Sequence, residues 1–270
     1  MHELHYFLLP SHTVISIMKI TLSLSPAAQV ETECLVAVVL DRAENNDKQK
    51  PGRPKNDKAE AFVSASEKAV QQAAADLISS GDVAGKTFEI SWVHKPDGLK
   101  AKRLLLVGGG KTKIFSAAEL RKIAGAAVRA LKPRSLRSLA FVVPEQIASE
   151  DAVKAIVEGA MVGNFDADTY KSDRKDQTVE SLTVVATGNQ KTLQQAVDEA
   201  HIVGESQNFT RELVNEPSNR MTPTTLAKRA QEMSKEVGLK CEVYGADKIK
   251  ESGHQKVWTD VGRGPFESQC

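Results

Sequence analysis

Three consecutive glycines, Gly108–Gly110, follow the apolar run Arg103–Val107 and precede a Lys-Thr-Lys stretch. Glycines between a strand and a helix can bind phosphate, because the uncovered backbone N–H groups at a helix N-terminus attract anions. The run has neither the G-x-G-x-x-G spacing of a dinucleotide site nor the G-x-x-x-x-G-K-[ST] pattern of a P-loop. We therefore favour a tight turn at these glycines, and a nucleotide-type ligand site at Gly108–Gly110 is the alternative.

Acidic side chains gather around Tyr170, where Asp166, Asp168 and Asp173 could offer oxygen ligands to calcium. Calcium needs a tighter frame of ligands with a glycine turn, and this stretch also carries lysine and arginine. A solvated loop is therefore favoured. The six histidines are scattered. His201 falls within an expected helix, where a surface or interface position is favoured over a role as metal ligand.

Length and composition limit the number of domains and the classes of partner that we expect. The chain has 270 residues, 41% of them hydrophobic, and a formal net charge of +1. This length predicts one or two domains, and the near-zero charge gives no support to a nucleic-acid partner. Cys34, Cys241 and Cys270 are far apart and odd in number. They predict a reducing, cytoplasmic setting rather than a secreted disulfide framework.

The first seventeen residues are mildly apolar but do not have the sequence pattern of a targeting segment. They lack a basic start and a small-residue cleavage site, and they are too short and too polar to span a bilayer. We expect residues 1–17 to be a disordered extension, with the ordered protein beginning near Met18. An extra edge strand at Thr13–Ile17 is the alternative.

Apolar runs and amphipathic stretches alternate along the rest of the chain. The β-branched run within Glu33–Leu40 is typical of a strand covered on both faces. Ser116 and Glu119 match the S-x-x-E capping box of a helix, and Ser149 can cap another. We predict strands at 19–24, 33–40, 88–93, 103–107, 138–143 and 181–186. We predict helices at 59–80, 116–131, after Ser149, and at 191–214. The class is α/β: a mixed, largely parallel sheet flanked by helices. The charged stretch 42–58 is expected to be a solvated loop rather than a phosphate site.

Prolines interrupt the stretch NFTRELVNEPSNRMTPTT, residues 208–225. Pro217 lacks a backbone donor and disfavours helical geometry before it, so the long helix must end near Asn215. Thr222 can cap a new helix with Pro223 in its first turn. That helix should end at Gly238, and LKCEVYG should form a further strand. The joint is either a domain boundary or a helix–helix corner.

The stretch NFTRELVNEPSNRMTPTTLAKRAQEM resembles the passage from the N-terminal into the catalytic domain of leucyl aminopeptidases, also called cytosol aminopeptidases. GLKAKRLLLVGGGKTKIFSAAELRKIAGAAVRALK and VEGAMVGNFDADTYKSDRK are similar to earlier parts of the same family, in the same order. The resemblance covers about Met18 to Gly253. It implies a macro-domain-like N-terminal domain at 18–186, a connecting helix and proline-containing joint at 187–220, and a truncated start of the catalytic domain at 221–270.

The family's activity is metal-dependent release of N-terminal amino acids, such as leucine, from peptides. The resemblance implies two divalent metals (manganese or zinc), peptide substrates, a homohexamer and a cytoplasmic location for the complete protein. The family's N-T-D-A-E-G-R motif does not occur here. The carboxylates after Met221 match none of the family's ligand positions: Glu232, Glu236, Glu242, Asp247, Glu251, Asp260 and Glu267.

We therefore assign no catalytic, cofactor-binding or metal-ligating residue in this chain and expect it to be inactive alone. Because the resemblance fades near Gly253, we expect a truncated or frame-disrupted copy. Two other functions stay open. One is a stand-alone macro-like module for an ADP-ribose-type ligand near Gly108–Gly110. The other is an interaction subunit of an aminopeptidase oligomer. Neither nucleic acid nor membrane is an expected partner.

Overall fold

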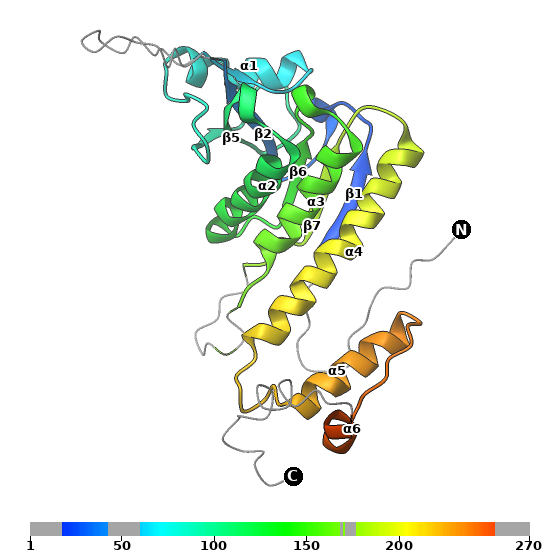
Figure 1. Cartoon of the computed structure of the whole chain (residues 1–270). Coiled ribbons are helices and arrows are strands. Elements are labelled where there is room, and N and C mark those ends of the chain that lie inside the picture. The colour runs from blue at the N-terminus through cyan, green and yellow to red at the C-terminus, as the bar shows by residue number, and fades with distance from the viewer. Residues whose placement is uncertain (1–17, 43–59, 168–169, 171–176, 252–270) are drawn as a thin grey trace, which may run out of the picture. The chain divides into compact units, whose positions relative to one another are not determined.

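The buried apolar runs assemble into one mixed sheet, seen in Figure 1, a computed structural model that describes residues 18–42, 60–167, 170 and 177–251. The strand order is β1-β7-β6-β2-β5-β4, and β3 pairs with β2 beside this path. The strands are β1 (Lys19–Ser23), β2 (Cys34–Asp41), β3 (Ala61–Val63), β4 (Ile90–His94), β5 (Arg103–Lys111), β6 (Ser138–Val142) and β7 (Ser181–Val185). Neighbours from β1 to β5 are parallel, whereas β3 and β4 are antiparallel to their partners. The predicted fold class is confirmed.

Helices cover both faces of this sheet. They are α1 (Lys68–Ser79), α2 (Ala117–Leu131), α3 (Glu150–Asn164) and the first part of α4 (Gln190–Asn215). Two further helices follow along the chain, α5 (Pro223–Glu236) and α6 (Ala246–Glu251). Alternate residues of β2 point to opposite faces, so Val36 and Val38 join the core with α2, α3 and the start of α4. Leu35 and Ala37 join a second core with α1. Burial on both faces explains the continuous apolar run of β2.

The chain divides into two compact units, and their boundary among the described residues falls between Asn208 and Phe209, within α4. The larger unit holds the sheet with α1, α2, α3 and most of α4. The smaller unit holds the last turns of α4 with α5 and α6. Residues 1–17, and with them the expected strand at Thr13–Ile17, lie outside the described residues. So do residues 43–59 and the solvated loop expected there.

Helix boundaries largely follow the local signals. Ser149 accepts a hydrogen bond from Ala152 N at 3.2 Å, as an N-cap should. Thr222 accepts one from Thr225 N at 3.2 Å, and Pro223 opens α5. The capping box is the exception. Ser116 precedes α2 but makes no side-chain cap hydrogen bond.

The helix expected at 59–80 begins later than predicted. Residues 61–63 form β3, which pairs with the end of β2, and α1 starts only at Lys68. Phe62 has helical spacing to the following alanines, yet pairing with the sheet satisfies more backbone groups than an isolated extra turn would. Glu67 then fixes the helix start, because its carboxylate accepts hydrogen bonds from Ala27 N and Ala28 N.

The segment LKCEVYG, expected as a strand, has no regular structure. A strand needs a neighbour for its backbone hydrogen bonds, and the described part of the smaller unit contains only helices and loops. The alternating pattern of this segment is therefore not sufficient by itself. Gly238 does adopt the positive φ of 72° that suits the end of α5.

Candidate functional site

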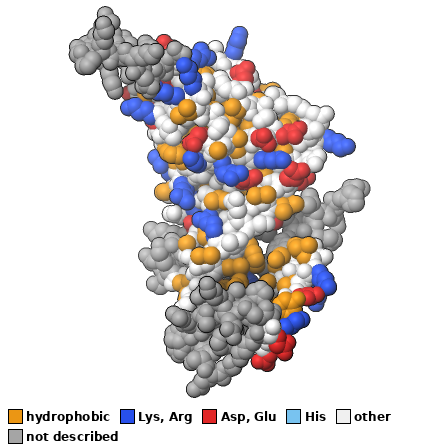
Figure 2. Space-filling view, viewed as in Figure 1, with side chains coloured by type: hydrophobic (Ala, Val, Ile, Leu, Met, Phe, Trp, Pro, Cys, Tyr) orange, Lys and Arg blue, Asp and Glu red, His pale blue; other side chains and the backbone are white. Residues whose placement is uncertain are grey.

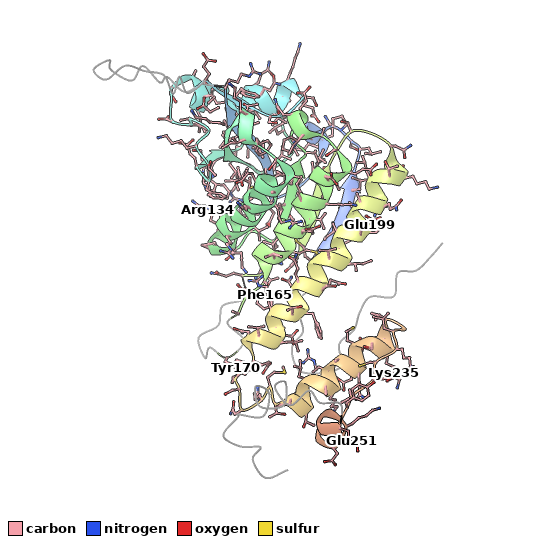
Figure 3. The ribbon with its side chains drawn as sticks, in the orientation of Figure 1. Arg134, Phe165, Tyr170, Glu199, Lys235 and Glu251 are labelled. Atoms are coloured by element: carbon pink, nitrogen blue, oxygen red, sulfur yellow. The ribbon has the colours of Figure 1, made fainter. Side chains whose placement is uncertain are left out.

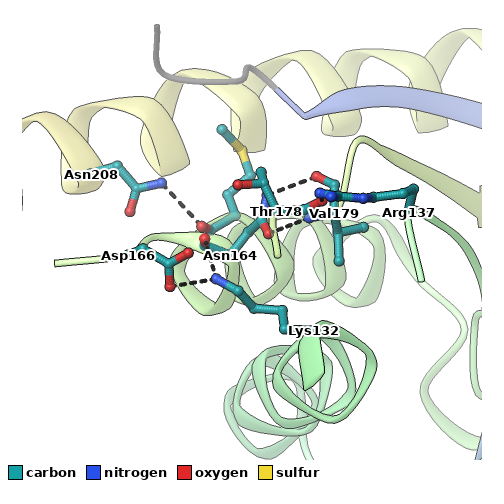
Figure 4. A network of polar contacts seen from close by, with 8 residues as sticks. Lys132, Arg137, Asn164, Asp166, Thr178, Val179 and Asn208 are labelled. Atoms are coloured by element: carbon teal, nitrogen blue, oxygen red, sulfur yellow. Dashed lines mark hydrogen bonds and ion pairs between the residues drawn. The ribbon is translucent and has the colours of Figure 1, made fainter. Parts of the chain in front are cut away.

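The C-terminal end of α3 carries a buried polar network that joins four parts of the larger unit (Figure 4). The last four carbonyl groups of any helix lack partners within it and need donors from elsewhere. Two of those in α3 find side-chain donors. Asn208 Nδ2 donates to Met161 O at 3.1 Å, and Lys132 Nζ donates to Asn164 O at 2.9 Å.

Lys132 brings a positive charge to this helix end. Its side chain is 9% exposed and its Nζ also contacts Asp166 Oδ1 at 2.6 Å. A cation near a helix C-terminus complements the negative end of the helix dipole. The ammonium group therefore satisfies one orphan carbonyl and one carboxylate, which allows a lysine to be buried.

Asn164 completes the network from inside the protein. Its Nδ2 donates to Val179 O, its Oδ1 accepts from Val179 N, and both distances are 2.9 Å. Arg137 Nη1 donates to the neighbouring Thr178 O at 2.7 Å. The chain is thus held on both sides of residues 168–176. The network positions backbone and brings no reactive group to a cavity, so we interpret it as structural.

The predicted acidic cluster is only partly described. Asp166 pairs with Lys132, so its charge is already compensated. Asp168 and Asp173 lie outside the described residues. Tyr170 is exposed and follows Phe165 on the segment after α3 (Figure 3). His201 lies in α4 with its Nε2 3.6 Å from Glu205 Oε1, one turn along the same helix.

The glycines Gly108–Gly110 are part of strand β5, so the predicted tight turn is wrong. Their role is to let another segment approach closely. Phe88 N donates to Gly108 O at 2.9 Å and Gly110 N donates to Gly85 O at 2.8 Å. A Cβ on Gly108 would overlap the carbonyl oxygen of Lys86. The protein's own backbone occupies the space that a phosphate would need beside Gly108.

Helix packing in the larger unit also depends on small residues. A Cβ on Gly159 of α3 would overlap Arg121 O of α2, and one on Gly163 would lie 2.7 Å from Gly125 Cα. On α4, a Cβ on Gly204 would come within 2.5 Å of Met161 Sδ. These glycines set the close approach that places Asn208 beside the end of α3.

Two titratable features stand out in the larger unit. Burial raises the pKa of Cys34 to about 12, so its thiol stays protonated at neutral pH. On the surface, Lys154 Nζ lies 2.6 Å from Glu199 Oε2. That hydrogen bond, with a second from Gln195, lowers the pKa of Glu199. Neither feature faces a described cavity.

In the smaller unit, Arg229 ties α5 to the end of α4. Its Nη2 donates to Glu212 Oε1 at 3.1 Å, and its guanidinium lies 5.5 Å from the Phe209 ring centre. Apolar side chains of this unit remain exposed, and Ser234 is the buried residue of α5. The exposed ones are Val214, Leu226, Val237, Leu239, Val243 and Tyr244. Hydrophobic side chains at the surface are orange in Figure 2. The described part of this unit therefore has little core of its own.

Ligands for the expected pair of metals are not assembled in the described residues. No three histidine, cysteine, aspartate or glutamate side chains among them come together as a metal site requires. The described carboxylates of the smaller unit take other roles: Glu242, for example, pairs with Lys240 at 2.9 Å. The residues described here do not fit a two-metal centre.

None of the described helices is both long and apolar enough to cross a membrane.

Two models of one protein family match the chain. The N-terminal domain of the cytosol aminopeptidase family matches residues 48–174, and the catalytic domain of the same family matches residues 208–269. The chain belongs to the cytosol aminopeptidase family. The second match extends past Gly253, so the expectation that the resemblance fades there is wrong.

Individual relatives agree with this membership. A probable cytosol aminopeptidase of Koribacter versatilis (strain Ellin345) is 44% identical over 269 residues, covering 93% of this chain and 50% of its own length. Tomato leucine aminopeptidase, solved as a mutant, matches with a TM-score of 0.69 at 23% identity, covering 96% of this chain and 50% of that one. The bottromycin maturation enzyme BotP in complex with Mn matches with a TM-score of 0.56 at 28% identity. The match covers 72% of this chain and 40% of that one. This cytosol aminopeptidase family member spans about half the length of the relatives it matches.

Proposed function

We propose that these 270 residues form the non-catalytic, amino-terminal part of a leucyl aminopeptidase-like protein and do not hydrolyse peptides alone. This proposal depends on how residues 208–269 match the family. They match its catalytic-domain model, yet the N-T-D-A-E-G-R motif, which carries part of the family's metal ligands and catalytic groups, is absent from the sequence. In the complete protein, the activity would be metal-dependent release of N-terminal amino acids from peptides. Manganese or zinc as the metal, a homohexameric assembly and a cytoplasmic location belong to the same proposal.

The proposed division assigns residues 18–186 to a macro-domain-like N-terminal domain, 187–220 to the connecting helix and joint, and 221–270 to the start of the catalytic domain. Two observations support it. The boundary between the compact units falls within α4, and the end of α4 is followed by Pro217 and a newly capped helix. The exposed apolar side chains of the smaller unit support the view that its residues belong to a larger core.

A chimera tests this assignment by gain of function. The part of this chain that matches the Koribacter versatilis relative would be joined to the part of that relative that follows its matched region. We expect the chimera to hydrolyse leucine p-nitroanilide with added Mn²⁺, and the unfused chain not to. The intact relative is the positive control. A folded chimera that stays inactive while the relative is active would contradict the assignment.

A further inference from the structure

Strand β4 ends the sheet, and its outer edge carries unpaired backbone groups. Gly108 N donates to Glu89 O at 2.7 Å, and Lys95 N donates to Lys102 O at 3.1 Å. Glu89 N donates instead to Lys86 O at 2.9 Å, but the Glu89 carbonyl and the Lys95 N–H point toward β5. Because direction alternates along an antiparallel pair, Ser91 and Val93 direct their backbone groups toward β5 as well. Ile90, Trp92 and His94 direct theirs away from the sheet.

Nothing in the described part of the chain pairs with that outer edge. The order of strands stops at β4, and no hydrogen bond across the edge involves the backbone of Ile90, Trp92 or His94. Natural sheets protect such edges with proline, charged residues or bulges. The strand Ile90–His94 reads ISWVH, has no proline, lysine, arginine or acid, and pairs with β5 without a bulge.

The edge strand also packs against both cores and is flanked by apolar side chains. Trp92 packs against the core that contains α2, with the Arg134 guanidinium 4.4 Å from its ring centre (Figure 3 shows Arg134). Val93 packs into the opposite core. Ile90 is 39% exposed and the preceding Phe88 is 46% exposed. A strand held on both faces loses little conformational entropy on gaining a neighbour.

We propose that the outer edge of β4 pairs antiparallel with β4 of a second copy of this chain, about a two-fold axis at Trp92. In this register Ile90 lies opposite His94 of the second copy, and Trp92 lies opposite its own equivalent. All three residues have outward-facing N–H and C=O groups, so each can form hydrogen bonds across the axis. A shift of the pairing by one residue would oppose outward-facing to inward-facing groups and lose these bonds.

Charge favours the same register. Glu89 and Lys95 stand just outside the two ends of β4. The two-fold axis places Glu89 of each copy opposite Lys95 of the other copy, so opposite charges face each other at both ends of the pairing. Glu89 is already held in place, since its Oε2 accepts from Ala84 N at 2.9 Å and Lys86 N at 3.2 Å. Opposite charges across paired strands are favourable and like charges are not.

Amide hydrogen exchange of the 270-residue chain, resolved residue by residue by NMR, tests the proposal. We expect the amides of Ile90, Trp92 and His94 to become protected as protein concentration rises. The amides of Ser91 and Val93 are protected at every concentration, because β5 already binds them. If the amides of Ile90, Trp92 and His94 are equally protected at every concentration, a segment of the same chain pairs with the edge. Absence of protection at all concentrations would leave it unpaired. Either result overturns the proposal.

A matched pair of variants separates edge pairing from other association. Ile90→Pro removes an outward N–H without touching the bonds to β5, as edge positions allow. By symmetry the dimer loses two hydrogen bonds, so sedimentation equilibrium should show its dissociation constant rising about thirtyfold. Ile90→Ala removes the side chain but keeps the N–H, and should weaken the dimer less. Equal effects of the two variants, or none, would contradict the proposal. If Ile90→Pro does not fold, the exchange of the unmodified chain decides.

Discussion

Asn164 and Val179 are 15 residues apart and exchange two hydrogen bonds of 2.9 Å, so that one side chain replaces a neighbouring strand for the backbone of Val179. Both residues are buried. The pair fixes the point where the chain returns from α3 toward β7. It connects the end of α3 to the segment that leads into β7 (Figure 4).

Replacing Asn164 should therefore cost considerable stability. Asn164→Ala leaves a buried N–H and a buried C=O of Val179 without partners, and each such group costs about 1–3 kcal/mol. We expect the free energy of unfolding in urea to fall by about 2–4 kcal/mol. Asn208→Ala is the matched control, because its bond to Met161 O lies at a half-buried site and its loss should cost about 1 kcal/mol. A loss for Asn164→Ala no larger than that control would contradict this role.

The close approach of α2 and α3 predicts a steric effect at Gly159. Gly159→Ala should destabilise the chain by about 1–3 kcal/mol, because the new methyl group overlaps Arg121 O and forces the helices apart. At Gly125 the added Cβ would lie 3.1 Å from Gly159 O, and alanine is the better helix former. Gly125→Ala should therefore cost less. Thermal unfolding of the two variants compares their losses of stability. A larger loss for Gly125→Ala than for Gly159→Ala would refute this prediction.

Cys34 predicts a specific loss of stability at alkaline pH. Burial raises the pKa of its thiol to about 12 in the folded state, against 9.0 for an ordinary thiol. The unfolded chain thus releases this proton at lower pH, so folding stability falls as pH rises from about 9 to 12. Cys34→Ala should reduce that fall when urea unfolding is compared at pH 8 and pH 10.5. An identical slope in both proteins would show that Cys34 does not contribute.

Lys154 and Glu199 predict a shift that NMR can follow directly. The hydrogen bond from Lys154 lowers the pKa of Glu199. Such a lowered pKa contributes stability above the unfolded value, and that contribution is lost as pH falls through the folded value. Lys154→Met should raise the Glu199 pKa toward its ordinary range. Lys122→Met, which breaks a similar pair with Glu119 elsewhere, should leave it unchanged. An unaltered Glu199 pKa in Lys154→Met would show that the pair does not persist in solution.

Local sequence signals predicted much of the fold because they depend on neighbouring residues. The apolar run of β2, the serine before α3 and the prolines around Thr222 all act within one or two turns of chain. Each gave an element close to its observed bounds. Family membership also followed from short stretches of sequence in the right order, and the two family models confirm it.

The errors arose where distant residues decide the outcome. Phe62 has helical spacing but pairs with the end of β2. Gly108–Gly110 remain within strand β5, with Gly110 at a φ of 79°, and residues 85–88 cross close beside them. The partnership of Asn164 with Val179 was not predicted, since no local pattern marks an asparagine whose side chain binds the backbone of a residue 15 positions away. The open edge of β4 needed the strand order, which sequence periodicity does not supply.

The most direct test of the proposed function is the turnover of leucine p-nitroanilide by the purified 270-residue chain with Mn²⁺ or Zn²⁺ added. The Koribacter versatilis relative, prepared and assayed in the same way, provides the reference rate. We predict a rate for this chain equal to that of buffer containing the same metal, while the relative turns over substrate. Metal-dependent hydrolysis by the chain that scales with its concentration and persists through repurification would contradict the account.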